Sequence, residues 1–293
     1  MTEPAHFPAD LNLEEFGFEA TPWDEGPASG PDDLALYVVG DVHGRSDLLG
    51  AMHGAIALSI KEGAQLGEQR PAVICYVGDY VDRGPDPLGA IDLARAPAPA
   101  GCSKIALVGN HEQFIIDFLS EPARAPLADW VRYGGAATLA ALGLDPPRKG
   151  GDREAVAALR PSIEAALGAE RLAFLAALRS AARFGGYVVV HAGIDPRREL
   201  HEQRIEDVLW IRQRFIEHPG PFPGGVAVIH GHSIMQPGVY GARVAVDGGA
   251  YASGRLTAAE IRGSKIRFIT ASTAPPTRGN TVRVASEWLR PEQ

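Results

Sequence analysis

The sequence contains few cysteines, no strongly basic segment and no long apolar run. Only two of its 293 residues are cysteine, which excludes a disulfide framework and a zinc cage built from cysteines. Without a basic patch, broad affinity for nucleic acid is not expected. No stretch reaches the roughly 18 apolar residues of a membrane span, and the N-terminus lacks the features of a secretory signal. We therefore expect a cytoplasmic protein with reduced thiols that binds neither nucleic acid nor membrane.

The net charge of −8 is unevenly distributed along the chain. Residues 1–33 hold nine of the 36 acidic residues, five prolines and no Lys or Arg. This composition predicts a flexible acidic arm rich in Pro and Gly, which Phe16, Phe18 or Trp23 could dock onto the body. We expect the principal domain at 34–263 and a C-terminal extension at 264–293, with an edge strand at 266–270.

Six short apolar runs each end in a metal-ligating residue beside a glycine. The runs lie within residues 34–44, 72–84, 104–112, 185–193, 225–233 and 242–249. Each is rich in Val, Ile, Leu or Tyr, which predicts a strand buried on both faces. The polar residues come just past the carboxyl ends of these strands, where open α/β sheets collect their ligands.

The side chains that follow the runs form one set of candidate metal ligands. They are Asp41, His43, Asp79, Asn110, His191 and His232, and the sixth run ends on Asp247. Carboxylate, amide and imidazole groups suit Mn²⁺, Fe²⁺ or Zn²⁺. The sequence therefore predicts a two-metal hydrolytic site on one rim of a sheet. We prefer His232 to His230 as a ligand because His230 ends the strand itself, and we expect a structural role for Asp247.

A long segment separates the third candidate strand from the fourth. Residues 126–184 contain alanine-rich stretches that predict helices at about 153–167 and 169–183. An insert of this length beside the ligand rim is typical of a lid or substrate-recognition cap. Further helices are expected at about 46–62, capped by Ser46, at 87–95 and at 112–120, and the segment 205–217 is expected to be helical or irregular.

Five motifs in order resemble the phosphoprotein phosphatase branch of the calcineurin-like metallophosphoesterases. They are GDVHG (40–44), GDYVDRG (78–84), GNHE (109–112), HAG (191–193) and GHS (231–233). The likeness extends over about 34–262 and is strongest to lambda-phosphatase-like bacterial and phage members and to diadenosine tetraphosphatases. It implies an α/β fold, the four-layer α/β/β/α sandwich of that family, here carrying a helical insert as a cap.

The resemblance also implies how the ligands divide between two divalent metal ions. Asp41 and His43 would hold the first ion, Asn110, His191 and His232 the second, and Asp79 would bridge both. Mn²⁺ is the expected metal, with Fe or Zn as alternatives. Metals that share a carboxylate can supply hydroxide near neutral pH, and this metal-bound hydroxide would attack phosphorus directly, without a phosphoenzyme.

The same resemblance assigns the catalytic residues. His111 would be the general acid, with Asp82 accepting its other N–H. Arg83 would bind phosphate oxygens through forked hydrogen bonds, and Arg212, with Arg214 behind it, is the second expected phosphate ligand. Val108 stands where many members carry Arg, so one phosphate contact differs.

These features favour a serine/threonine protein phosphatase, a phosphomonoesterase acting on phosphorylated protein, peptide or small phosphoesters. Symmetrical cleavage of dinucleoside polyphosphates such as diadenosine tetraphosphate is the alternative, because Val108 and the insert leave room for it. A catalytically idle scaffold is disfavoured by the intact set of ligands. The physiological substrate, the native metal and the oligomeric state stay open at this point.

Overall fold

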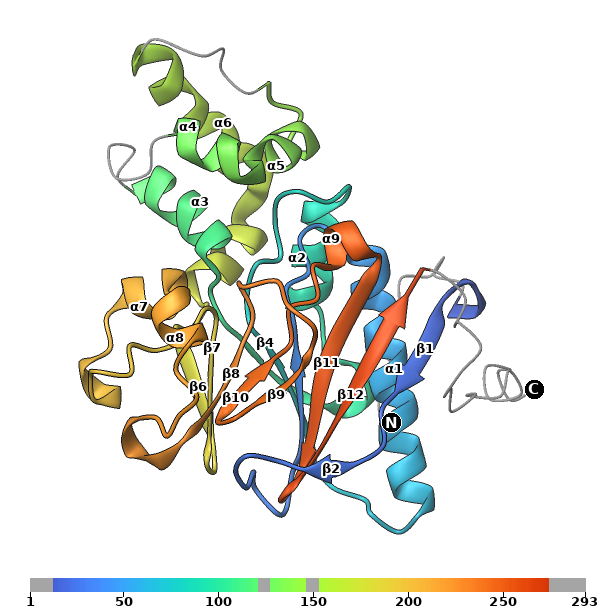
Figure 1. Ribbon diagram of the computed structural model, residues 1–293. Coiled ribbons are helices and arrows are strands. Elements are labelled where there is room, and N and C mark those ends of the chain that lie inside the picture. The colour runs from blue at the N-terminus through green and yellow to red at the C-terminus, as the bar shows by residue number, and fades with distance from the viewer. Residues whose placement is uncertain (1–12, 121–126, 146–152, 274–293) are drawn as a thin grey trace.

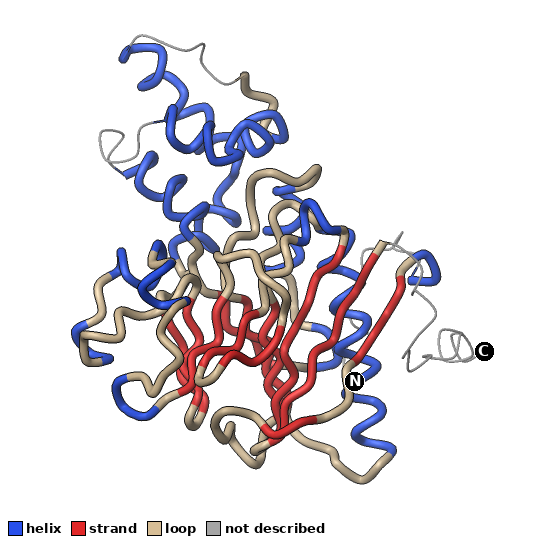
Figure 2. Tube along the Cα trace, in the orientation of Figure 1, coloured by secondary structure: helices blue, strands red, loops and turns tan. Residues whose placement is uncertain are grey.

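The protein is built around two β-sheets that pack face to face (Figures 1 and 2). A computed structural model describes residues 13–120, 127–145 and 153–273. In the seven-stranded sheet the order is β1-β12-β11-β3-β4-β5, with β2 paired to β12, and in the five-stranded sheet it is β6-β7-β8-β10-β9. The first sheet comprises β1 (Gly17–Ala20), β2 (Asp24–Glu25), β3 (Ala35–Val39), β4 (Ala72–Tyr76), β5 (Ser103–Ala106), β11 (Arg255–Arg262) and β12 (Lys265–Ser272). The second comprises β6 (Ala181–Phe184), β7 (Tyr187–Val190), β8 (Ala227–His230), β9 (Gly238–Tyr240) and β10 (Arg243–Ala245).

Helices cover the outer face of each sheet, so the expected α/β/β/α sandwich is confirmed. Helices α1 (Ser46–Gln65) and α2 (Pro87–Arg95) share an apolar core with the first sheet. Helices α7 (Ile205–Trp210) and α8 (Gln213–Ile216) share another with the second sheet. A third core lies between the sheets.

Strand β3 shows why the predicted strands are apolar throughout. Leu36 and Val38 enter the core between the sheets, whereas Tyr37 and Val39 enter the core beneath α1. Both faces of the strand are covered, so both alternating sets of side chains are apolar. The pairs β3–β4, β4–β5, β7–β8 and β8–β10 are parallel, which brings their carboxyl ends to one rim.

The helical insert stands together at one end of the sandwich (Figure 1). It contains α4 (Leu127–Trp130), a π-helical turn η3 (Val131–Gly135), α5 (Ala136–Ala141) and α6 (Arg153–Ala176), and the preceding helix α3 (Asn110–Ser120) packs against α4 and α6. A left-handed Gly168 breaks α6 at the predicted boundary between two helices. The predicted helix to 183 is wrong at its end, because residues 181–184 form β6 and pair with β7 across a turn at Gly185 and Gly186. None of the helices described here is long and apolar enough to cross a bilayer.

The N-terminal segment differs from the expected flexible arm over residues 17–25. Strand β1 pairs with β12 from Gly17↔Ser272 to Ala20↔Ile269, and β2 pairs with the start of β12. The Trp23 ring faces two guanidinium groups, with Arg267 Cζ 4.6 Å from its centroid. Phe18 and Ala20 pack against the core beneath α1. Core-facing residues thus alternate along β1, a strand pattern that the acidic composition of the segment concealed. Residues 1–12 of the predicted arm lie outside the described part.

The other differences concern element ends. The predicted strand at 266–270 exists as β12, but it is an interior strand, because β11 pairs on one side and β1 and β2 on the other. Helix α1 begins at Ser46 with Arg45 as its N-cap residue, and the Ser46 hydroxyl donates instead to Asp86. Both cysteines are free, as expected. Residues 274–293 of the predicted extension lie outside the described part.

Candidate metal centre

Five strand ends deliver the six predicted ligands to one rim. Asp41 and His43 follow β3, Asp79 follows β4, Asn110 begins α3 after β5, His191 follows β7 and His232 follows β8. None of the six side chains is more than 6% exposed. The set predicted from sequence is therefore brought together in a buried position, at the strand ends of both sheets.

The backbone of this rim is strained at the predicted site residues. Within the described ranges, the non-glycine residues with positive φ are His43, Asp79, Asp82, Arg83 and His232, with φ between 44° and 69°. Each such conformation costs on the order of 1–3 kcal/mol and is typical of functional sites. All five belong to the predicted set of ligands and catalytic residues, so the strain is concentrated in the site.

Two glycines allow the loops after β4 and β5 to touch. A Cβ atom on Gly78 would lie 2.4 Å from the nitrogen of Gly109, and one on Gly109 would lie 2.1 Å from Oδ1 of Asp79. Both contacts are far inside van der Waals distance and involve backbone or a buried carboxylate. The glycines before Asp79 and Asn110 are therefore required by close approach of the two loops.

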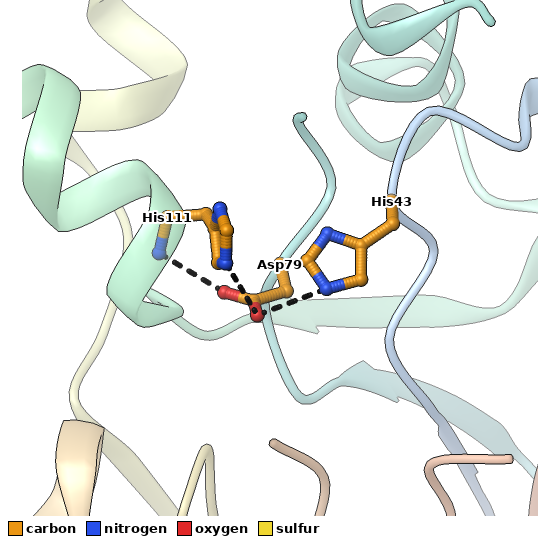
Figure 3. Close-up of side chains that lie close together, drawn as sticks. All are labelled: His43, Asp79 and His111. Carbon is orange, nitrogen blue, oxygen red and sulfur yellow. Dashed lines mark hydrogen bonds and ion pairs between the residues drawn. The ribbon is translucent and has the colours of Figure 1, made fainter. Parts of the chain in front are cut away.

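Asp79 lies at the centre of the site with imidazoles on both sides (Figure 3). Its Oδ2 is 3.3 Å from Nε2 of His43, and its Oδ1 is 3.4 Å from Nε2 of His191. Two groups of side chains with metal-ligand spacing share this residue: one adds His43 and His111, the other His191 and His232. The arrangement can hold two cations around one carboxylate. The first group contains His111 where the sequence analysis placed Asp41.

Asn110 joins the two histidines of the second group. Its Oδ1 lies 2.9 Å from Nε2 of His191 and 2.8 Å from Nδ1 of His232. An amide oxygen so close to two imidazole nitrogens places three potential ligand atoms around one point.

Several buried groups in the site fit a divalent cation. Among the described residues, Oδ1 of Asp41 is buried at the site without a hydrogen-bond partner. Burial, followed by the charges of Asp247 and Asp79, raises the pKa of Asp41 well above its usual value. Burial raises the pKa of Asp247 to about 6. Neighbouring buried carboxyls of this kind are stabilised in their charged form by a nearby cation.

The histidines are held in the protonation state that a metal requires. Burial lowers the pKa of His43 to about 3 and that of His232 to about 2, and it also lowers the pKa of His191. The three imidazoles are thus neutral at pH 7 and can offer a lone pair. Nδ1 of His43 and Nδ1 of His191 face the carbonyls of Val81 and Val77 at 2.9 and 3.0 Å. These bonds leave each Nε2 directed at Asp79.

His111 and Asp82 form a buried pair beside this group. Nδ1 of His111 lies 2.6 Å from Oδ2 of Asp82. Burial lowers the pKa of His111, but the charge of Asp79 and the hydrogen bond to Asp82 outweigh it, so the pKa lies above its usual value. This imidazole therefore retains a proton more readily than its neighbours.

Two side chains of the insert donate hydrogen bonds to Asp82 that the sequence analysis did not predict. Nε1 of Trp130 donates to both carboxylate oxygens, at 2.9 Å to Oδ2, and the Thr138 hydroxyl donates to Oδ1. Trp130 and Thr138 lie in an alanine-rich helical stretch without a motif, where they resemble ordinary core residues. The insert therefore helps to hold Asp82 in place beside His111, in addition to the role of a cap expected from the sequence.

Glu112 organises the loops that carry the ligands. Its buried carboxyl accepts hydrogen bonds from the backbone N–H groups of four residues: Asp79, Tyr80, Val81 and Gly109. Burial, and then the charge of Asp79, raises its pKa to about 7. The sequence analysis recognised Glu112 only as the start of a helix, although it is the last residue of the GNHE motif.

Two of the three predicted arginines lie at the site. The Arg83 guanidinium donates to Nε2 of His43 at 2.8 Å and to Nε2 of His111 at 3.0 Å. Arg212 Nη1 donates to the carbonyl of His232 at 3.2 Å. Arg214 is instead paired with Asp195 at 2.8 Å. Val108 is buried in the core beneath α7 and α8 and offers no charge to the site.

Comparisons with known proteins agree with this geometry. The model of the calcineurin-like phosphoesterase family matches residues 34–252. Serine/threonine-protein phosphatase 1 of Salmonella typhimurium (strain LT2) is 28% identical over 235 residues, which cover 78% of this chain and 92% of that protein. The crystal structure of a candidate diadenosine tetraphosphatase superposes with a TM-score of 0.53 at 21% identity, covering 86% of this chain and all of that one; at this identity the likeness concerns the fold alone.

The family match includes every strand end of the rim described above. Members of the family use a dinuclear metal centre, and the histidine and aspartate groups around Asp79 could bind such metals. The chain therefore belongs to the calcineurin-like phosphoesterases, a family of metal-dependent phosphoester hydrolases.

Proposed function

We propose that the protein is a dinuclear-metal serine/threonine protein phosphatase that uses Mn²⁺. The observation that carries this proposal is the position of Asp79, whose two oxygens each face a different imidazole while the His111–Asp82 pair lies alongside. A shared carboxylate next to an acid and its orienting partner suits hydrolysis of a phosphoester.

The ligands divide as the family resemblance implies. Asp41 and His43 would hold one ion, Asn110, His191 and His232 would hold the other, and Asp79 would contribute to both. The unpartnered Oδ1 of Asp41 supports its place in the first group, and the Asn110 contacts support the second. When bound, the metals would polarise the phosphoester and activate water for attack.

The chain's own residues bind the phosphate and move one proton. Arg83 and Arg212 bind phosphate oxygens. In the structure Arg83 donates to Nε2 of His111, so its transfer to phosphate leaves that nitrogen free to carry a proton. His111 then donates this proton to the leaving oxygen, while Asp82 holds Nδ1 and stabilises the charged imidazole.

The leaving group favours serine or threonine phosphate as substrate. An alkoxide from Ser or Thr is a poor leaving group, so its departure depends on proton donation. The raised pKa of His111 favours the protonated form that a general acid requires. The similarity to the Salmonella serine/threonine phosphatase supports the same choice.

A second candidate function is cleavage of dinucleoside polyphosphates. Two aromatic side chains beside the site are partly exposed, Tyr133 at 44% and Trp210 at 37%. The Trp210 ring lies 6.1 Å from that of His232, and 6.3 Å from that of Tyr133. Exposed aromatic faces can stack on nucleobases, so this pair could receive an adenine.

A side-by-side assay separates the two candidates. The Mn²⁺-loaded protein is given a phosphothreonine peptide and diadenosine tetraphosphate, with the metal-free protein as control. The proposal predicts a much larger kcat/KM for the peptide and no turnover without metal. A larger kcat/KM for the dinucleotide would replace the proposal with the second candidate.

A further inference from the structure

A groove of about 700 Å³ opens beside the candidate metal centre. Its floor includes Glu19 of β1, Thr257 of β11 and Thr270 of β12, strands that lie side by side in Figure 1. One wall is the loop of residues 234–237, which leads into β9, the edge strand of the second sheet. The groove therefore lies between the part of the first sheet formed by β1, β12 and β11 and the edge of the second sheet at β9.

The floor is a sheet face that the second sheet does not cover. On β11 and β12, Ile261 and Ile266 lie in the core between the sheets. Because side chains alternate along a strand, Thr257 and Thr270 belong to this same face. They line the groove instead of packing under the second sheet, since that sheet ends at β9.

The groove begins directly beside the loops that carry the site. Ile234 follows His232 by two residues and is 53% exposed. The next residue, Met235, donates its backbone N–H to the carbonyl of Asp247 at 3.1 Å. If the phosphate of a protein substrate lies at the metal centre, the residues next to the phosphorylated one would thus reach the groove.

The charge of the groove suits a polypeptide more than a polyphosphate. Arg255 and Glu19 line it, but they form an ion pair at 2.7 Å and offset each other. The remaining lining groups are uncharged, with hydroxyls such as that of Thr270 beside apolar side chains such as Phe268 and Ile234. Hydroxyls can bind peptide groups, whereas a polyphosphate chain would find no excess of positive charge here.

We propose that this groove binds the residues flanking the phosphorylated side chain of a protein substrate. The inference rests on the proposed protein phosphatase activity and adds a second binding site to it. It involves residues before 34 and after 252, outside the part that matches the family. The N-terminal strand β1 would then serve substrate selection as well as sheet closure.

The test compares phosphopeptides of different length. One phosphothreonine peptide carries a single residue on each side and the other carries six, and p-nitrophenyl phosphate serves as a substrate without flanking residues. The Mn²⁺-loaded wild type is compared with Thr270→Arg, which blocks the floor, and with Gln236→Arg at the exposed wall. Val239→Arg, at an exposed position of β9 that does not line the groove, is the matched control.

The wild type should turn over the longer peptide with a kcat/KM about tenfold higher than the shorter one, because remote contacts contribute binding energy. Both groove variants should lose this gain while they retain p-nitrophenyl phosphate hydrolysis. Val239→Arg should keep the gain for the longer peptide. No gain in the wild type, or a gain that survives both groove variants, would overturn the inference. Turnover of diadenosine tetraphosphate without turnover of either peptide would instead refute the protein phosphatase activity on which the inference rests.

Discussion

Nδ1 of His111 lies 2.6 Å from Oδ2 of Asp82, in a buried pair that borders the carboxylate of Asp79. This contact fixes which nitrogen of His111 faces the site, because Nδ1 is held by Asp82 while Nε2 faces Asp79 and Arg83. The acid role proposed for His111 depends on that orientation, so the pair is the first target for mutation.

His111→Ala should slow hydrolysis of a phosphothreonine peptide by roughly 10²–10⁴-fold, the usual contribution of a general acid. The loss for p-nitrophenyl phosphate should be much smaller, because p-nitrophenolate leaves without a proton. Steady-state kinetics on both substrates with Mn²⁺-loaded protein measure the difference. Equal losses on the two substrates would contradict the acid role.

Trp130→Phe removes the indole N–H that donates to both carboxylate oxygens of Asp82. Thr138→Val removes the hydroxyl that donates to Oδ1 and accepts from the Asp82 N–H, while keeping the shape of that side chain. Loss of one charged hydrogen bond is worth about 1.5–3 kcal/mol, so each variant should reduce kcat on the phosphothreonine peptide at least tenfold. The reduction for p-nitrophenyl phosphate should again be smaller, following the pattern of His111→Ala. If kcat is unchanged for both variants, the insert does not support the pair.

Glu112→Gln should destabilise the rim. In the wild type the carboxyl accepts from four backbone N–H groups, whereas the amide of Gln would place an NH₂ donor against some of these donors. We expect the free energy of unfolding to fall by about 2–3 kcal/mol, the scale of lost hydrogen bonds to a charged group. Urea unfolding of the metal-free protein measures it, with Glu170→Gln at a mostly exposed position as control. A variant as stable as the control would show that the four contacts contribute little.

His53, which lies away from the metal centre, should make the stability of the protein depend on pH. It is buried with Nε2 2.8 Å from the Tyr76 hydroxyl, and burial lowers its pKa from 6.5 to about 4. The unfolded chain takes up a proton below pH 6.5 that the folded chain resists until about pH 4. As the pH is lowered from 6.5 to about 4, this residue should therefore reduce the free energy of unfolding by up to about 3 kcal/mol.

His53→Gln keeps a neutral hydrogen-bonding group beside Tyr76 and should lack this part of the loss. The comparison uses urea unfolding of metal-free wild type and variant between pH 7 and pH 4.5, so that the contributions of other histidines cancel. Curves with the same pH dependence would refute the assignment.

The rim was predictable because its signals are local in the sequence. Each of Asp41, Asp79 and Asn110 follows its own apolar strand after a glycine, and parallel strands necessarily bring their carboxyl ends to one edge. The order of the motifs then supplied the fold through the family resemblance. Strand ends and helix boundaries were less certain, as β6 shows, because a short hairpin at Gly185 and Gly186 interrupts an alanine-rich stretch that favours helix.

The supporting contacts were not predictable because they join segments far apart in the chain. Trp130 and Thr138 reach Asp82 only after the insert has packed, and nothing in their local sequence marks them. The same is true of β1, whose place beside β12 depends on residues about 250 positions away. The groove between the sheets exists only through that pairing, so it left no signal in the sequence.

The central claim is that two metal ions share Asp79, and counting bound Mn²⁺ tests it most directly. Metal-free protein is titrated with Mn²⁺, bound metal is quantified, and electron paramagnetic resonance detects coupling between neighbouring ions. The wild type should bind two coupled ions per chain, and peptide hydrolysis should appear with the second. Asp79→Asn should lose the coupling and the activity. A wild type that is fully active with one ion or none, or an Asp79→Asn variant that keeps a tight coupled pair, would contradict the account.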